Sequence, residues 1–127
     1  MRIIHTDQAP AAIGPYSQAM EVNGVLFTSG QIAINHETGS IEATDIAGQA
    51  DQACRNIEAI LKEAGVGFGQ VVKTTCYLTD MSFFNAFNEV YARYFVSKPA
   101  RSCVAVAALP KNAMCEIEAI AEMKAGE

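Results

Sequence analysis

Residues 46–64 carry apolar side chains at steps of three and four residues, a spacing typical of an amphipathic helix. Asp45 stands where an N-cap residue belongs, and Gly65 stands where a glycine commonly ends a helix. Only one side of this helix is apolar, so the helix must pack against a second layer of the protein. The apolar positions are Ile46, Ala50, Ala53, Cys54, Ile57, Ile60, Leu61 and Ala64.

The chain before this helix is typical of β-structure. Asn23 and Gly24 form the strongest short signal for a type I′ hairpin turn. Residues 9–16 contain two prolines and a glycine and predict a loop. Residues 31–44 predict a long excursion with at most a short extended piece at 32–34. The expected strands are residues 2–5, 17–22 and 25–30.

The chain after the helix predicts a strand, a second helix and two more strands. Residues 71–79 are rich in β-branched and aromatic side chains. Asp80 or Ser82 is the expected cap of the second helix, which ends near Phe95. Its expected apolar stripe is Phe83, Phe87, Val90 and Tyr94, and the last two strands are expected at 101–107 and 115–122.

These elements predict an α+β fold in which a mixed sheet of about six strands carries both helices on one face. The whole chain, residues 1–127, is expected to form a single domain. The opposite face of the sheet is then expected to stay apolar and uncovered. Subunits that pack sheet to sheet would bury that face.

Composition excludes several classes of protein. The net charge is −5 and no cluster of Lys and Arg is present, which weighs against nucleic-acid binding. The four cysteines lie far apart with no paired spacing, so they predict buried thiols in a reducing compartment instead of disulfides or a zinc site. With no signal peptide and no apolar run long enough for a bilayer, the chain is expected to be cytoplasmic. No nucleotide-binding or catalytic-metal motif is present, so no cofactor and no metal are expected.

Two kinds of charged residue are candidates for chemistry. Arg101 opens a strand after a proline, where a guanidinium can bind a carboxylate through two parallel hydrogen bonds; the alternative is an ordinary exposed arginine. Glu116 and Glu118 lie two residues apart in the last strand and so share one face. One of them could orient a water as a general base, and the alternative is an edge strand whose glutamates face solvent.

Five further residues are candidates for a ligand site. Tyr16 ends a Gly-Pro turn and could donate a hydrogen bond, or could only cover the core. Ser29 and Gly30 end a strand, where glycine permits close approach of backbone, but Ser29 has no evident histidine base. Cys103 shares a face with Arg101 and is interpreted as a buried thiol. Asn88 could line a pocket or face solvent.

Six segments together resemble the Rid (reactive intermediate deaminase) family, also called the YjgF family. They run through the whole chain in the family's order, and their combination is far more specific than any one of them. The segments are APAAIGPYSQA (9–19), LFTSGQI (26–32), VVKTTCYLTDM (71–81), FNEVYARYF (87–95), KPARSCVAVAALPKNA (98–113) and EIEAIAE (116–122).

The resemblance implies a chorismate-mutase-like fold and a homotrimer with a barrel-like core and a ligand pocket in each cleft between subunits. It implies that Arg101 binds the substrate carboxylate and that Glu116 positions the attacking water. It also implies that other side chains line the pocket or neighbour the ligand; these are Tyr16, Ser29, Gly30, Asn88 and Cys103.

The implied activity is that of a 2-iminobutanoate/2-iminopropanoate deaminase, a hydrolase that acts on C=N bonds. Such an enzyme converts reactive 2-imino acids, including the imine tautomer of 2-aminoacrylate, to 2-keto acids and ammonia without a cofactor. It thereby removes reactive products of PLP-dependent enzymes. The alternative is a non-catalytic trimer that binds or senses small carboxylates such as ketoacids. A ribonuclease or translation inhibitor, a third interpretation attached to relatives, is disfavoured by the net charge of −5.

Overall fold

The structure, a computed structural model, describes residues 1–123. In this part of the chain, six strands form one mixed sheet in the order β1-β2-β3-β8-β6-β7. Strands β6 and β7 pair in parallel, and the other neighbours pair antiparallel. The strands are β1 (Arg2–Ile4), β2 (Ala19–Val22), β3 (Val25–Thr28), β6 (Val71–Leu78), β7 (Ala100–Ala105) and β8 (Cys115–Glu122).

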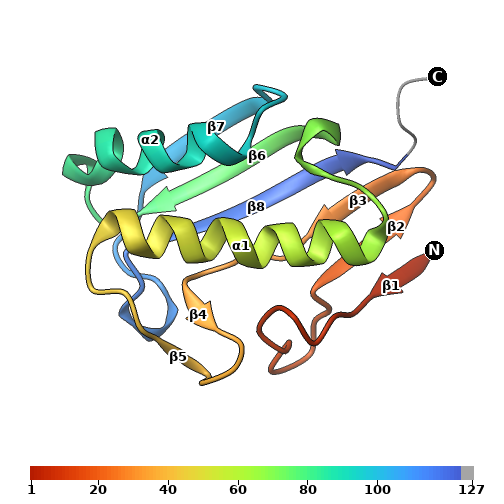
Figure 1. The fold of residues 1–127 in the computed structure, drawn as a ribbon, viewed down its shortest axis with the longest axis horizontal. Coiled ribbons are helices and arrows are strands. Elements are labelled where there is room, and N and C mark those ends of the chain that lie inside the picture. The colour runs from red at the N-terminus through yellow and green to blue at the C-terminus, as the bar shows by residue number, and fades with distance from the viewer. Residues whose placement is uncertain (124–127) are drawn as a thin grey trace.

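Both helices, α1 (Ile46–Ala64) and α2 (Phe84–Tyr94), lie on the same side of this sheet (Figure 1). Asp45 caps α1 by accepting a hydrogen bond from the Gly48 amide, and Gly65 ends it in the left-handed conformation at φ 90°. The long helix, its cap and its end therefore fall where the sequence predicts them. The expected α+β fold with two helices on one face of a six-stranded mixed sheet is confirmed.

The β2–β3 hairpin turns at Asn23 and Gly24, whose φ angles are 50° and 78°. Positive φ at both positions is the requirement of a type I′ turn, and these two residue types meet it at low cost. The hairpin is therefore the one that the sequence predicts, although its strands are shorter at their outer ends. Ser29 and Gly30 lie just beyond β3.

The region 31–44 contains a feature that the sequence analysis did not predict. Strands β4 (Ile34–Asn35) and β5 (Ser40–Ile41) form a small hairpin outside the main sheet. Two-residue strands are too short to show an alternating pattern, and so composition gave no signal for them.

The second helix begins later than expected. Asp80 caps a short 3₁₀ turn, Met81–Phe83, by accepting from the Ser82 amide, and α2 follows from Phe84. Its buried side chains are Phe87, Val90 and Tyr91, so Tyr91 takes the core position expected for Tyr94.

The two faces of the sheet differ in what covers them. Toward the helices, β8 presents Cys115, Ile117, Ala119 and Ala121, all buried in the core. On the open face, a row of side chains crosses four neighbouring strands, from β1 at the edge to β8, in register: Ile3, Met20, Phe27 and Ile120. Ile3 is 63% exposed and Phe27 is 44% exposed. The open face is mixed instead of wholly apolar, because it also carries Glu116 and Glu118.

The cysteines are all free thiols; Cys54, Cys76 and Cys115 are buried and Cys103 is half-buried. Within residues 1–123, no helix is both long enough and apolar enough to cross a membrane.

Candidate functional site

Arg101 lies on the edge strand β7, opposite Thr74 of β6, and its side chain points toward α2. Its Nη1 donates to Oδ1 of Asn88 at 2.7 Å. Its guanidinium carbon stands 4.8 Å from the centre of the Tyr91 ring and 5.5 Å from that of Phe84. Stacking on aromatic faces and one amide contact fix the guanidinium without neutralising its charge.

The surroundings of Arg101 are themselves held in place. The Tyr91 hydroxyl is hydrogen-bonded to Oγ1 of Thr74 at 2.7 Å, and both side chains are buried. Arg101 and Asn88 lie at the edge of a groove of about 570 Å³ that also includes Lys98 and Pro99. This arrangement suits an anionic ligand, because the free edge of the guanidinium retains unused donors.

Glu116 belongs to a second pocket, of about 310 Å³, whose lining combines β8 with three other segments of the chain, residues 10–18, 30–34 and 110–111. The lining residues are Pro10, Ala11, Ile13, Tyr16, Gln18, Gly30, Gln31, Ile32, Ile34, Pro110, Lys111 and Glu116. Burial, with repulsion from Glu118 as a smaller cause, raises the pKa of Glu116. A carboxylate whose pKa is raised is a stronger base than an exposed one and so a better proton acceptor.

Gly30 leaves the space in which the Glu116 carboxylate lies. A Cβ atom at residue 30 would stand 2.2 Å from Oε2 of Glu116 and 2.7 Å from its Cδ. No side chain fits there without displacing the carboxylate. The glycine therefore brings backbone close to another residue of the site, which is the close approach that its strand-end position suggested.

Glu118, the other carboxylate on this face, accepts a hydrogen bond from a neighbouring strand. The Tyr77 hydroxyl donates to Oε1 of Glu118 at 2.6 Å. This hydrogen bond raises the pKa of Tyr77 to about 12. Glu118 does not line the pocket, so the structure distinguishes the two glutamates that the sequence pattern alone could not.

Arg101 and Glu116 point to opposite faces of the sheet. Arg101 shares the helix-covered face with its register partner Thr74. Glu116 alternates with the buried Cys115 and Ile117 and so lies on the open face. One chain therefore contains two separate groups of candidate residues, one around Arg101 and Asn88 and one around Glu116, Gly30 and Tyr16.

Of the remaining sequence candidates, Tyr16 lies with Glu116, Cys103 lies on the same face as Arg101, and Ser29 lies with neither. Tyr16 lines the Glu116 pocket, is 54% exposed, and its hydroxyl accepts from the Ile13 amide at 3.3 Å. Cys103 lies on the Arg101 face, where burial raises the pKa of its thiol despite the opposing effect of Arg101. The Ser29 hydroxyl donates to the Ser17 carbonyl at 2.5 Å and lines a separate hollow beside β2 and β3.

Sequence reasoning missed several residues of the site. Lys111 lines the Glu116 pocket in a turn with φ 57°, but a lysine after a proline carries no recognisable signal. Gln18 was seen only as part of a strand, although its buried side chain reaches the pocket. Tyr91, whose ring lies against the Arg101 guanidinium, was not among the predicted site residues. Within residues 1–123, His, Cys, Asp and Glu form no group of three that could hold a metal ion.

Comparison with known proteins places this geometry in a family. A family model described as Endoribonuclease L-PSP matches residues 6–123. The human 2-iminobutanoate/2-iminopropanoate deaminase is 49% identical over 121 residues, which cover 94% of this chain and 88% of the human protein.

Solved structures agree over almost the whole chain. The structure of E. coli TdcF with bound serine has a TM-score of 0.92 at 44% identity, covering 96% of this chain and 98% of that chain. YyfA of Yersinia pestis, described as a member of the conserved Rid protein family, has a TM-score of 0.92 at 48% identity, covering 95% and 98% of the two chains. The resemblance found in the sequence is thus confirmed, and the chain belongs to the Rid family, to which the L-PSP family model corresponds.

Proposed function

We propose that this protein hydrolyses 2-imino acids, such as 2-iminobutanoate and 2-iminopropanoate, to 2-keto acids and ammonia. The observation that carries the proposal is the Glu116 carboxylate, which lies against Gly30 in a largely apolar pocket with its pKa raised by burial. The name of the human relative and the serine bound to TdcF support a small substrate of the amino-acid type.

The complete site combines two copies of the chain. Arg101 and Glu116 point to opposite faces of one sheet, so a substrate that touches both must lie between neighbouring copies. Ile3, Phe27 and their neighbours expose apolar surface on the open face, and covering it with another copy would remove that surface from water. We therefore propose a homotrimer with one cleft at each subunit boundary.

Each charged side chain then has a distinct role. Arg101 of one copy holds the substrate carboxylate, which fixes the position of the adjacent C=N carbon. Glu116 of the next copy accepts a proton from a water molecule as the water oxygen adds to that carbon. The imine nitrogen takes this proton from Glu116 and becomes the amino group of a carbinolamine. Glu116 then accepts the hydroxyl proton and returns it to the amino nitrogen as the C–N bond breaks, so ammonia leaves and the oxygen becomes the carbonyl of the 2-keto acid.

The rival function is a trimer that binds small carboxylates without chemistry. Arg101 serves both functions, whereas a second negative charge beside the ligand weakens simple binding of an anion. Glu116 therefore favours the enzyme. RNA as a substrate is disfavoured by the net charge of −5.

A coupled assay tests the proposal. A serine dehydratase generates 2-aminoacrylate from serine, this protein is added, and the disappearance of the imine is followed against a dehydratase-only control. The expected result is faster loss of imine in proportion to the protein added. If the protein binds 2-oxobutanoate but does not accelerate imine loss, the deaminase proposal is wrong and the binding protein replaces it.

A further inference from the structure

The loop before β2 forms one wall of the Glu116 pocket although it has no strand to pair with. Pro10, Ala11, Ile13 and Tyr16 all line the pocket from this loop. Between β1 and β2 the chain forms no regular element, so its main chain depends on side chains for hydrogen bonds.

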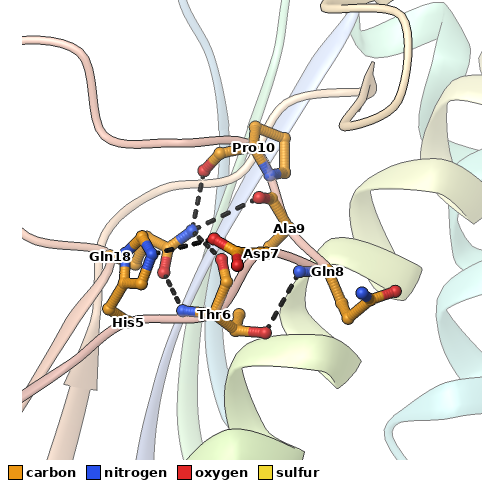
Figure 2. Close-up of polar contacts among 7 residues, drawn as sticks. All are labelled: His5, Thr6, Asp7, Gln8, Ala9, Pro10 and Gln18. Carbon is orange, nitrogen blue, oxygen red and sulfur yellow. Dashed lines mark hydrogen bonds and ion pairs between the residues drawn. The ribbon is translucent and has the colours of Figure 1, made fainter.

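Gln18 supplies those hydrogen bonds (Figure 2). Its side chain is buried, and its Oε1 accepts from the Thr6 amide at 2.7 Å. Its Nε2 donates to the carbonyls of Thr6 at 3.0 Å, Pro10 at 2.8 Å and Ala9 at 3.4 Å. One carboxamide thus holds the main chain of residues 6–10 by hydrogen bonds at both ends of that segment.

The main chain of Gln18 connects this loop to the other side of the pocket. Its carbonyl accepts from the Ser29 amide at 2.8 Å, and Ser29 directly precedes Gly30. Gly30 in turn lies against the Glu116 carboxylate. The Gln18 side chain therefore bonds the pocket wall, and its main chain bonds the segment just beyond β3, where Gly30 lies beside the Glu116 carboxylate.

A carboxamide is required for this arrangement. The site offers one amide donor and several carbonyl acceptors, and a Gln side chain provides an acceptor and two donor hydrogens in one group. Methionine has the same length but cannot make these bonds, and a carboxylate would face the carbonyl oxygens with no hydrogen to donate.

We propose that Gln18 is a positioning residue that sets the Pro10–Tyr16 wall at the distance from Glu116 which the substrate requires. The proposal rests on the proposed function for its kinetic test. The wall contacts the substrate, whereas Glu116 and Gly30 keep their own strand contacts. Loss of Gln18 should therefore weaken substrate binding more than it slows the chemical step.

The test compares Gln18→Met with the control Gln70→Met. Gln70 also bonds main chain through its carboxamide, donating to the Glu122 carbonyl at 3.1 Å, but at the end of β8 far from Glu116. Gln18→Met should raise KM for the imine and Kd for 2-oxobutanoate by about tenfold, with kcat nearly unchanged. Amide hydrogen exchange at Thr6 and Gln8 should accelerate in the same variant. Gln70→Met should change neither the kinetics nor these amides.

The split between KM and kcat separates positioning from mere loss of fold. A variant that only unfolds more often lowers the active fraction, so kcat falls while KM stays constant, and that result overturns the proposal. An unchanged KM in Gln18→Met together with faster amide hydrogen exchange also overturns the proposal. If Gln18→Met does not fold, Gln18→Glu, which keeps the acceptor and loses the donors, should give the same rise in KM. If the wild type shows no imine hydrolysis, the proposed function fails, and the change in Kd for 2-oxobutanoate still decides the role of Gln18; an unchanged Kd overturns it.

Discussion

The guanidinium of Arg101 contacts an amide oxygen and two aromatic rings, but among residues 1–123 it forms no ion pair with a carboxylate. Its charge is therefore held in a fixed place and remains available to an anion. An arginine that served only the fold would more often be paired with Asp or Glu. The contacts of Arg101 thus favour a ligand site over an ordinary exposed arginine.

Removing this charge should greatly reduce activity. Arg101→Ala should lower kcat/KM by at least about a hundredfold, because a charge-assisted contact to the substrate carboxylate is lost. Arg101→Lys should also be impaired, since the two parallel hydrogen bonds cannot form. Steady-state kinetics on imine loss measure both. Arg93→Ala, at an exposed position on α2, is the control and should be nearly silent; near-normal turnover by Arg101→Ala would exclude the assigned role.

Gly30→Ala tests whether the site depends on the space beside Glu116. The new Cβ would meet Oε2 of Glu116 at 2.2 Å, so the carboxylate must turn away from its place. We expect kcat to fall by about a hundredfold while the protein stays folded, because displacement of a catalytic group by about 1 Å has effects of this size. Gly69→Ala, where a Cβ meets nothing within 4 Å, is the matched control. Equal activity of the two variants would show that the position of Glu116 is unimportant.

The dependence of the rate on pH should report the pKa of Glu116. In the proposed mechanism Glu116 acts as the carboxylate, so the rate should fall as pH drops through its pKa, which burial and Glu118 raise above the ordinary glutamate value. Glu118→Gln removes the repulsion and should lower the pKa of Glu116, which moves the acidic limb of the kcat profile to lower pH. Glu116→Gln should lose the rate while it retains 2-oxobutanoate binding. If the acidic limb of the kcat profile does not move in Glu118→Gln, the group that titrates in that limb is not Glu116.

At the scale of single elements, the long helix α1 depends on its N-cap. Asp45→Ala removes the hydrogen bond to the Gly48 amide at 2.8 Å and should lower the free energy of unfolding by about 1 kcal/mol. Denaturant unfolding measures the change. Asp7→Ala, whose carboxylate has only an exposed contact with His5, should leave the midpoint nearly unchanged. Equal effects of the two substitutions would mean that the cap contributes nothing.

The elements that the sequence predicted best are those with local signals. Asp45, Gly65 and the apolar stripe fixed α1 to the residue, and Asn23-Gly24 fixed the hairpin. The β4–β5 hairpin was not predicted, because its two-residue strands are stabilised by a distant residue. The Asn56 side chain of α1 donates to the carbonyls of Ile32 and Ile34 at 2.9 Å. Contacts between distant segments leave no pattern along the chain.

The same limit applied to the site. Strand alternation indicated that Glu116 and Glu118 share a face, but not that Tyr77 engages Glu118 and Gly30 adjoins Glu116. The family resemblance named Arg101 and Glu116 together. Only the sheet register shows that they point to opposite faces of one chain.

At the scale of the whole molecule, the proposed cleft between subunits makes activity depend on assembly. Light scattering at micromolar concentration should give about three times the chain mass of 13.6 kDa. The specific activity should fall when the protein is diluted below the concentration at which it assembles, since in the proposed cleft the arginine and the glutamate come from different chains. Specific activity that stays constant in a monomeric sample would contradict both the trimer and the shared cleft.

The opposite orientation of Arg101 and Glu116 has a genetic consequence. A cell that makes both Arg101→Ala and Glu116→Gln chains assembles mixed oligomers, and some clefts then receive the intact arginine from one allele product and the intact glutamate from the other. Random mixing in equal amounts gives about one fully equipped cleft in four. Two alleles that are each inactive alone should therefore complement one another, whereas an allele that carries both substitutions should rescue neither.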